Sequence, residues 1–207
     1  TAGGKGSNRG SGTVSVKKTS ETNPPLQQTG ETDFTDVRGH WAQNAIYKLY
    51  DQGIVTGRSD ATFEPEATIT RAEFIALLVR ALKLQLAGYQ NAFNDVSGGD
   101  WYADVIQTAA NRGFLQGSEG CAYPNQPVTR KEMAALTVRA YETLCGEIKL
   151  SGGLLSFADA DQIADYALTA VKALYSAGII GGTEKGGKLV ISGKTGLFGA
   201  SVDELTG

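Results

Sequence analysis

Residues 69–74, Ile-Thr-Arg-Ala-Glu-Phe, return at 128–133 as Val-Thr-Arg-Lys-Glu-Met, and these two stretches decide the fold around them. A Thr followed three residues later by a Glu is the pattern of a capping box, in which each side chain binds the other residue's backbone N–H at a helix N-terminus. Apolar residues then follow at helical spacing: Phe74, Leu77, Leu78, Ala81 and Leu82, and in the second case Met133, Leu136, Ala140 and Leu144. Each stretch therefore predicts the start of an amphipathic helix.

The capping stretch closes a longer pattern that occurs twice in full. The pattern opens with Phe-x-Asp-Val, passes a Trp and a Gly-rich segment such as Gly-Ile-Val-Thr-Gly, and reaches the capping stretch through an aromatic residue and a Pro. Phe34 and Phe93 open the two copies; they lie 59 residues apart, as do Arg71 and Arg130 (93 − 34 and 130 − 71). A third copy opens at Phe157. Agreement in residue type and in spacing predicts three structural repeats.

Each repeat also carries an earlier amphipathic helix. Its apolar stripe is Ala42, Ile46, Leu49 and Tyr50 in the first repeat, and Ile163, Ala167, Ala170, Val171 and Leu174 in the third. Gly53 and Gly178 follow these stripes, where glycine can adopt the left-handed conformation that ends a helix. Neither helix pair is long enough to bury its stripes alone, so we expect the repeats to pack on one another as one helical unit.

Composition excludes several classes of protein. The 207 residues carry a net charge of −3, with acidic and basic residues interspersed, which is unlike a nucleic-acid-binding surface. No apolar run has the length of a membrane span. With His40 as the only histidine and two cysteines, we expect no metal site, no cofactor and no Cys-His nucleophile. Cys121 and Cys145 are compatible with a disulfide or with two free thiols.

The polar start of the chain has the composition of a linker. Residues 1–33 are mostly Gly, Ser, Thr, Asn, Lys and Pro, and we expect them to be disordered. The missing initiator Met predicts a mature or excised piece of a longer polypeptide. After this linker we assign the first repeat to 34–90, the second to 91–152 and an incomplete third to 153–207.

The third repeat departs from the pattern after its first helix. Residues 183–196 replace the short loop with a predicted strand at 188–192 and a turn at 193–196. The chain ends where the second helix is expected, and Gly207 stands where the other repeats have Arg. Two interpretations stay open: the repeat is truncated, or another chain completes its uncovered apolar face.

Arg71 and Arg130 are the candidate binding residues. Each lies in the first turn of a helix, where the helix dipole favours anions and disfavours cations. A guanidinium beside free backbone amides would make a carboxylate or phosphate receptor. The alternative is an ordinary ion pair of Arg71 with Glu73, Glu66 or Asp60.

The ordered set Phe-x-Asp-Val with Trp, Gly-Ile-Val-x-Gly, Phe-x-Pro and Ile-Thr-Arg-Ala-Glu-Phe resembles the S-layer homology domain, a module that anchors bacterial surface proteins to the cell envelope. The resemblance runs in full from Phe34 to about Leu144 and in part from Phe157 onward. It implies an all-α fold, a pseudo-threefold bundle of helix-loop-helix repeats. In that family the grooves between repeats hold secondary cell-wall polysaccharide, often through the carboxylate of a pyruvylated sugar.

The resemblance also implies a set of site residues: Arg71, Arg130, Gly57, Gly117, Trp41, Trp101, Asp36 and Asp95. The two arginines would bind the sugar carboxylate, the glycines would let the backbone approach the sugar, and the other residues would line the groove. Arg58 is our candidate for a second cation in the first groove. Its counterpart Ser118 has no charge, so the second groove is expected to bind an acidic sugar less well.

The expected function is non-covalent, noncatalytic anchoring at the outside of a bacterial cell, in the cell wall or S-layer. The expected partner is a secondary cell-wall polysaccharide or another peptidoglycan-linked glycan. The alternative is a structural S-layer or surface-assembly component whose incomplete third repeat docks a neighbouring chain or a second copy of itself. His40 belongs to the repeat pattern and has no triad partners in it, which disfavours catalysis.

Overall fold

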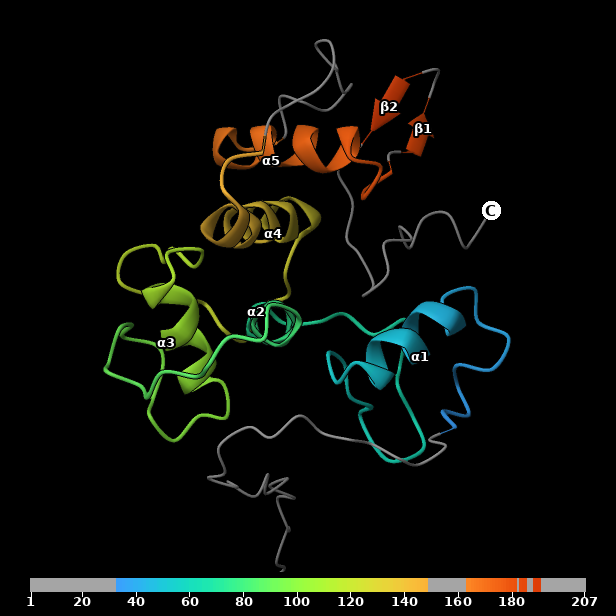
Figure 1. The fold of residues 1–207 in the computed structure, drawn as a ribbon, viewed down its shortest axis with the longest axis horizontal. Coiled ribbons are helices and arrows are strands. Elements are labelled where there is room, and N and C mark those ends of the chain that lie inside the picture. The colour runs from blue at the N-terminus through green and yellow to red at the C-terminus, as the bar shows by residue number, and fades with distance from the viewer. Residues whose placement is uncertain (1–32, 149–162, 182, 186–187, 191–207) are drawn as a thin grey trace, which may run out of the picture.

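The computed structural model describes residues 33–148, 163–181, 183–185 and 188–190, and these form a helical protein (Figure 1). The helices are α1 (Gln43–Asp51), α2 (Arg71–Ala81), α3 (Ala103–Asn111), α4 (Arg130–Cys145) and α5 (Asp165–Ser176). Two short antiparallel strands follow, β1 (Thr183–Lys185) and β2 (Lys188–Val190), with Thr183 opposite Val190. The expected linker before residue 33 and the expected turn at 193–196 lie outside the described residues.

The first helix of each repeat forms as the sequence predicts. Ile46 in α1, Ile106 in α3 and Val171 in α5 are each 0% exposed. Gly53 and Gly178 both end their helices at a φ of +68°, the left-handed region expected there.

The second helices α2 and α4 begin at the predicted capping boxes. Glu73 donates its backbone N–H to the Thr70 hydroxyl at 3.2 Å, and the Glu73 carboxylate accepts the Thr70 N–H at 2.7 Å. A capping box is also present at Thr129 and Glu132. Because both boxes satisfy N–H groups that an isolated helix leaves unpaired, the sequence fixes where these helices start.

The apolar face predicted for α2 packs in the core, but the helix also has a second buried face that the sequence analysis did not predict. Four of its buried residues follow the i, i+3, i+4, i+7 spacing of a face other than the predicted one, and the fifth, Phe74, belongs to the predicted face; the four are Ala72, Ile75, Ala76 and Val79. The predicted face is less protected, since Ala81 is exposed and Leu77 is half-buried. The cause is the central position of α2, which lies between the α1 region and α3 with α4 above it (Figure 1). A helix contacted on several sides needs apolar residues on several sides.

Helix packing runs between consecutive repeats. The second helix of the first repeat, α2, packs on α3 of the second repeat, and α4 of the second repeat packs on α5 of the third. A smaller contact joins α2 to α4. Helix α1 packs chiefly on its own loop, in a cluster that includes Phe34, Val55 and Phe63 and touches Leu77 of α2. The repeats therefore share cores, as expected for units too small to bury their own stripes.

The structure also bears on the two cysteines and on membrane spans. Cys121 and Cys145 are free thiols. Of the helices that the structure describes, none combines the length and the hydropathy that a membrane crossing requires.

Candidate functional site

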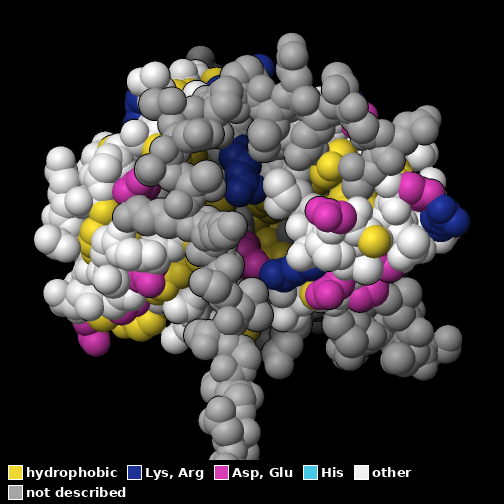
Figure 2. All heavy atoms as spheres, turned by 90° about the horizontal axis from the view of Figure 1, so that it is seen from below, with side chains coloured by type: hydrophobic (Ala, Val, Ile, Leu, Met, Phe, Trp, Pro, Cys, Tyr) yellow, Lys and Arg dark blue, Asp and Glu magenta, His cyan; other side chains and the backbone are white. Residues whose placement is uncertain are grey.

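A cavity of about 250 Å³ lies where the first repeat meets the second. The loop after α1 contributes Gly57 and Arg58, α2 contributes Glu73 and Arg80, and Trp101 comes from the second repeat. Figure 2 shows one face of the molecule, with a central hollow in which basic and acidic side chains lie beside apolar ones. A cavity with an aromatic side chain and charged groups has the mixed character of a small-ligand site.

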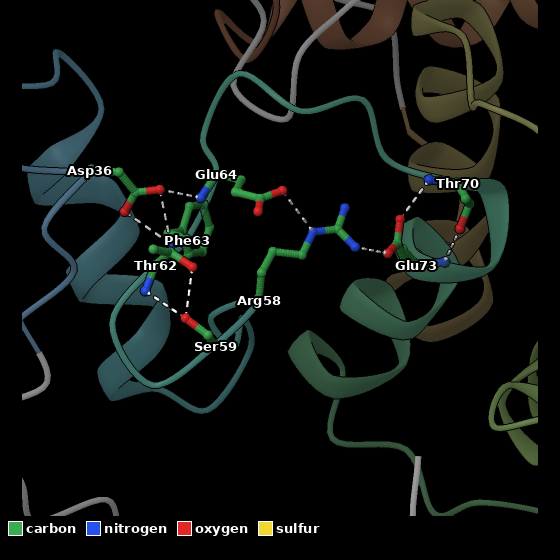
Figure 3. A network of polar contacts seen from close by, with 8 residues as sticks. All are labelled: Asp36, Arg58, Ser59, Thr62, Phe63, Glu64, Thr70 and Glu73. Carbon is green, nitrogen blue, oxygen red and sulfur yellow. Dashed lines mark hydrogen bonds and ion pairs between the residues drawn. The ribbon is translucent and has the colours of Figure 1, made fainter. Parts of the chain in front are cut away.

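Arg58 reaches from its loop across to α2 (Figure 3). Its Nη1 donates a hydrogen bond of 2.6 Å to Glu73 Oε1, and its Nε lies 3.9 Å from Glu64 Oε2. The side chain of Arg58 is 41% exposed. The guanidinium is thus held at one corner and remains open to solvent.

Asp36 and Asp95 hold backbone rather than line the groove with free carboxylates. The Asp36 carboxylate accepts the N–H groups of Phe63 at 3.0 Å and Glu64 at 2.6 Å (Figure 3). Asp95 does the same in the second repeat, at Ala122 and Tyr123. Partial burial acts to raise the pKa of Asp36, but these N–H hydrogen bonds outweigh it and the pKa is lowered.

Gly57 and Gly117 are needed for packing within their own repeats. A Cβ added at Gly57 would lie 2.5 Å from the Phe34 ring and 2.5 Å from the Ser59 carbonyl oxygen. A Cβ at Gly117 would collide with Phe93 in the same way. The close approach that only glycine allows is therefore made by the opening Phe of each repeat.

Arg71 is not among the residues that line this cavity, and its side chain contacts the second repeat. Its Nη1 is 3.3 Å from Glu132 Oε1, and its Nη2 is 3.4 Å from the Gln116 carbonyl oxygen. Its side chain is 14% exposed. Among the described residues, Arg71 Nε is the buried side-chain polar atom that has no hydrogen-bond partner. Neither Glu73 nor the other acidic residues considered from the sequence pairs with Arg71; the partner is Glu132, 61 residues away.

The backbone amides at the start of α2 are not free. Arg71 N–H donates to the Gln126 carbonyl at 2.8 Å, and Ala72 N–H donates to the Pro124 carbonyl at 2.9 Å. The third amide, of Glu73, is bound by the Thr70 hydroxyl. The free helix amides that we expected beside Arg71 are therefore not present, because the second repeat supplies carbonyls to two of them.

Arg130 repeats this arrangement one repeat further on. Its Nη2 donates a hydrogen bond of 3.0 Å to the Gly181 carbonyl. Gly181 follows Gly178 by three residues, as Gln116 follows Gly113. The Arg of one repeat thus contacts the same loop position of the next repeat in both cases.

Trp41 and Trp101 are surface residues, 60% and 51% exposed. Tyr166, which the sequence analysis missed, occupies the same position in the third repeat and is 50% exposed. All three residues precede the helix-ending glycine of their repeat by 12 residues, so counting back from Gly178 would have found Tyr166.

Arg80 and Arg139 were also missed, although the repeat offset of 59 residues relates them. Arg80 lines the cavity and donates to the Ile54 carbonyl at 3.3 Å, and burial lowers its pKa. The Arg139 guanidinium carbon lies 5.9 Å from the Tyr166 ring centre, within cation–π range. Each of these second-helix arginines thus lies near the exposed aromatic position of the next repeat.

Charged side chains surround Tyr166. Burial and Glu132 raise the pKa of Tyr166, while Arg71 and Arg139 act to lower it, and the result is a raised pKa. In the described ranges, no three His, Cys, Asp or Glu side chains gather in a way that could hold a metal ion.

Comparison with known proteins finds one family match in each of the three repeats. The family model of the S-layer homology domain matches residues 33–75, 92–134 and 156–187. The chain is 38% identical over 149 residues to an amylopullulanase of Thermoanaerobacterium thermosulfurigenes, covering 72% of this chain and 8% of that protein. It is 35% identical over 157 residues to the Surface-layer 125 kDa protein of Lysinibacillus sphaericus, covering 75% of this chain and 13% of that protein.

A third relative is the cellulosome-anchoring protein of Acetivibrio thermocellus, 40% identical over 79 residues, with 37% of this chain and 18% of that protein covered. The chain therefore spans less than a fifth of each of these three relatives. They differ in their named roles, and each shares with this chain only a limited region.

Proposed function

Because this chain belongs to the S-layer homology domain family, we propose that it anchors a bacterial surface protein to the cell envelope by binding secondary cell-wall polysaccharide. The bound group is an acidic, pyruvylated sugar held in grooves between repeats that close around a pseudo-threefold axis. A surface-layer protein and a cellulosome-anchoring protein among the relatives support a place at the cell surface. The module itself is noncatalytic, and its partner lies in the cell wall or S-layer.

The cavity between the first and second repeats carries this proposal. It combines an exposed indole, Trp101, with the guanidinium groups of Arg58 and Arg80. A sugar ring can pack on an indole face, and a sugar carboxylate can accept two parallel N–H bonds from a guanidinium. The volume of about 250 Å³ is close to the lower end of the range typical of small-ligand pockets, which fits one residue of a longer glycan.

A sedimentation assay with purified cell-wall sacculi tests the proposal. Binding of the whole chain is measured before and after chemical removal of the polysaccharide. We expect binding to intact sacculi and loss of binding on stripping. Equal binding to both, or binding to neither, would contradict glycan anchoring.

The second candidate is a structural surface-layer component whose third repeat docks another chain. It is favoured by the 35% identity to a surface-layer protein over 75% of this chain. The packing of α1 also favours it. Helices α3 and α5 each pack on the second helix of the preceding repeat, whereas α1 packs chiefly on its own loop, so a helix of another chain could take the corresponding place beside α1. Light scattering over a concentration series distinguishes the two: assembly predicts a mass that rises with concentration, and anchoring alone predicts a constant mass.

A further inference from the structure

The arginines of the repeat motif contact the following repeat, and this arrangement gives them a structural task. Arg71 bridges Glu132 and the Gln116 carbonyl, both in the second repeat, while Arg130 reaches Gly181 in the third. With 14% of its side chain exposed and its Nε enclosed, Arg71 presents little surface to a ligand. Its ion pair joins two repeats that also share a core.

The capping-box glutamates of the first two repeats, Glu73 and Glu132, pair with arginines from different places in the chain. Glu132 in the second repeat pairs with Arg71 of the repeat before it. Its equivalent Glu73 pairs with Arg58, which comes from the loop of the same repeat. The residue at the position of Arg58 in the second repeat is Ser118. The first repeat therefore carries its own cation at the place where the second repeat receives one from its neighbour.

Arg58 differs from Arg71 in how much of its guanidinium is accessible to a ligand. Its side chain is 41% exposed and lines the cavity, and its bond to Glu73 uses Nη1. Nε lies 3.9 Å from Glu64, beyond hydrogen-bonding distance. Within the part of the chain that the structure describes, neither Nε nor Nη2 donates a hydrogen bond, so their edge can meet a carboxylate with two parallel bonds once the ion pair of Nε with Glu64 gives way.

Glu73 orients the Arg58 guanidinium, and the Glu73 carboxylate is itself held by the capping box. The other carboxylate oxygen of Glu73 accepts the Thr70 N–H at 2.7 Å, so the capping box fixes the carboxylate that orients the guanidinium (Figure 3). Glu64, by contrast, is 57% exposed and touches the guanidinium only loosely. An incoming carboxylate would compete with Glu64 and leave the pair with Glu73 intact.

We propose that Arg58 is the residue that binds the ligand carboxylate in the first cavity, and that Arg71 is a positioning residue that ties the first two repeats together. This inference rests on the proposed glycan-binding function. It makes the first cavity a complete site built from two repeats, with Arg58 as the cation, Trp101 as the apolar platform and Glu64 as the competing anion.

The test compares Arg58→Ser, which installs the residue of the second repeat, with Arg112→Ser, an exposed arginine at the end of α3 that gives the same change in charge. Sedimentation with intact sacculi, with stripped sacculi as blank, gives the apparent Kd, and thermal unfolding is followed in parallel. We expect Arg58→Ser to weaken binding at least tenfold with little change in Tm, and Arg112→Ser to bind like wild type.

Three further variants make the assignment specific. Glu64→Gln removes the competing charge and is expected to tighten binding about two- to fivefold. Arg58→Lys keeps the charge but loses the two-pronged geometry, and we expect intermediate binding. Arg71→Met is expected to lower Tm, and its residual binding should follow the folded fraction.

The outcomes separate this inference from the function beneath it. Wild-type binding that is lost on stripping, together with unchanged binding by Arg58→Ser, would overturn the assignment of Arg58 and leave glycan anchoring standing. Wild-type binding that stripping does not reduce, or no wild-type binding at all, would overturn both. Equal losses from Arg58→Ser and Arg112→Ser would show a general charge effect and would also overturn the assignment.

Discussion

At the scale of single residues, the motif positions divide into those that build the loop and those that face the cavity. Asp36 serves the loop, because its carboxylate binds backbone N–H groups; Gly57 serves both, since it makes room for Phe34 and also lines the cavity. Arg58 and Trp101 face the cavity. A motif residue that recurs in every repeat can thus be recurrent for folding alone.

Replacing Asp36 by Ala should destabilise the protein by about 1–3 kcal/mol, because two backbone N–H groups lose a charged acceptor. Urea unfolding followed by circular dichroism measures this change. Asp60→Ala, in the same loop and exposed, is the matched control and should change the free energy of unfolding by less than about 0.5 kcal/mol. Equal effects of the two variants would contradict the role given to Asp36.

The same carboxylate predicts a pH dependence. The pKa of Asp36 is lowered in the folded protein, so its contribution to stability is present above the pKa of the unfolded chain. That contribution is lost as the pH falls through the lowered folded-state pKa. Urea unfolding between pH 7 and pH 2 should show wild type losing more stability in acid than Asp36→Ala does; parallel curves would rule this out.

Gly57→Ala should cost about 1–3 kcal/mol, because the new methyl group would overlap the Phe34 ring and a backbone carbonyl. Gly99→Ala provides the comparison, since a Cβ there meets nothing within 4 Å. Thermal unfolding of both variants checks the prediction. A Gly57→Ala protein as stable as Gly99→Ala would show that the loop can relax around the methyl group.

At the scale of elements, the helices start where local chemistry dictates and bury what the neighbouring repeats require. The capping boxes at Thr70 and Thr129 are local, since every partner lies within three residues. The burial of α2 is not local, because α3, α4 and the α1 cluster contact different sides of it. A stripe drawn on an isolated helix cannot show this.

Thr70→Ala should destabilise the protein by about 1 kcal/mol, because the Glu73 N–H loses its acceptor at the start of α2. The measurement is the urea midpoint at constant m-value. Thr35→Ala, which removes an exposed hydroxyl bond of 3.2 Å to Ala61, is the control and should cost less. A larger loss from the control would argue against the cap as the stabilising feature.

At the scale of the whole molecule, repeats depend on their successors. Helix α2 packs on α3 of the second repeat, and its first amides are bound by carbonyls of Gln126 and Pro124. A single repeat lacks both kinds of partner. Cooperativity between repeats is therefore expected, as in other arrays whose units share interfaces.

A fragment of residues 33–90 should consequently be largely unfolded, and a fragment of residues 33–148 should fold with a lower Tm than the whole chain. The physical reason is that the first cut exposes the side of α2 that packs on α3, whereas the second exposes only the side of α4 that packs on α5. Far-ultraviolet circular dichroism during heating measures both. A cooperative transition in the 33–90 fragment would contradict dependence on the second repeat.

The sequence by itself determined the helix starts at Thr70 and Thr129 and the glycine helix ends, because each rests on residues close together in the chain. It also determined the repeats and the family, because these rest on the order and regular spacing of motif residues. Only the tertiary structure decided that Arg71 pairs with Glu132 in the next repeat and that Arg58 lies in a cavity with Trp101. The physical reason is that a guanidinium pairs with whichever carboxylate the packing brings within reach. In this protein, packing between repeats sets that choice.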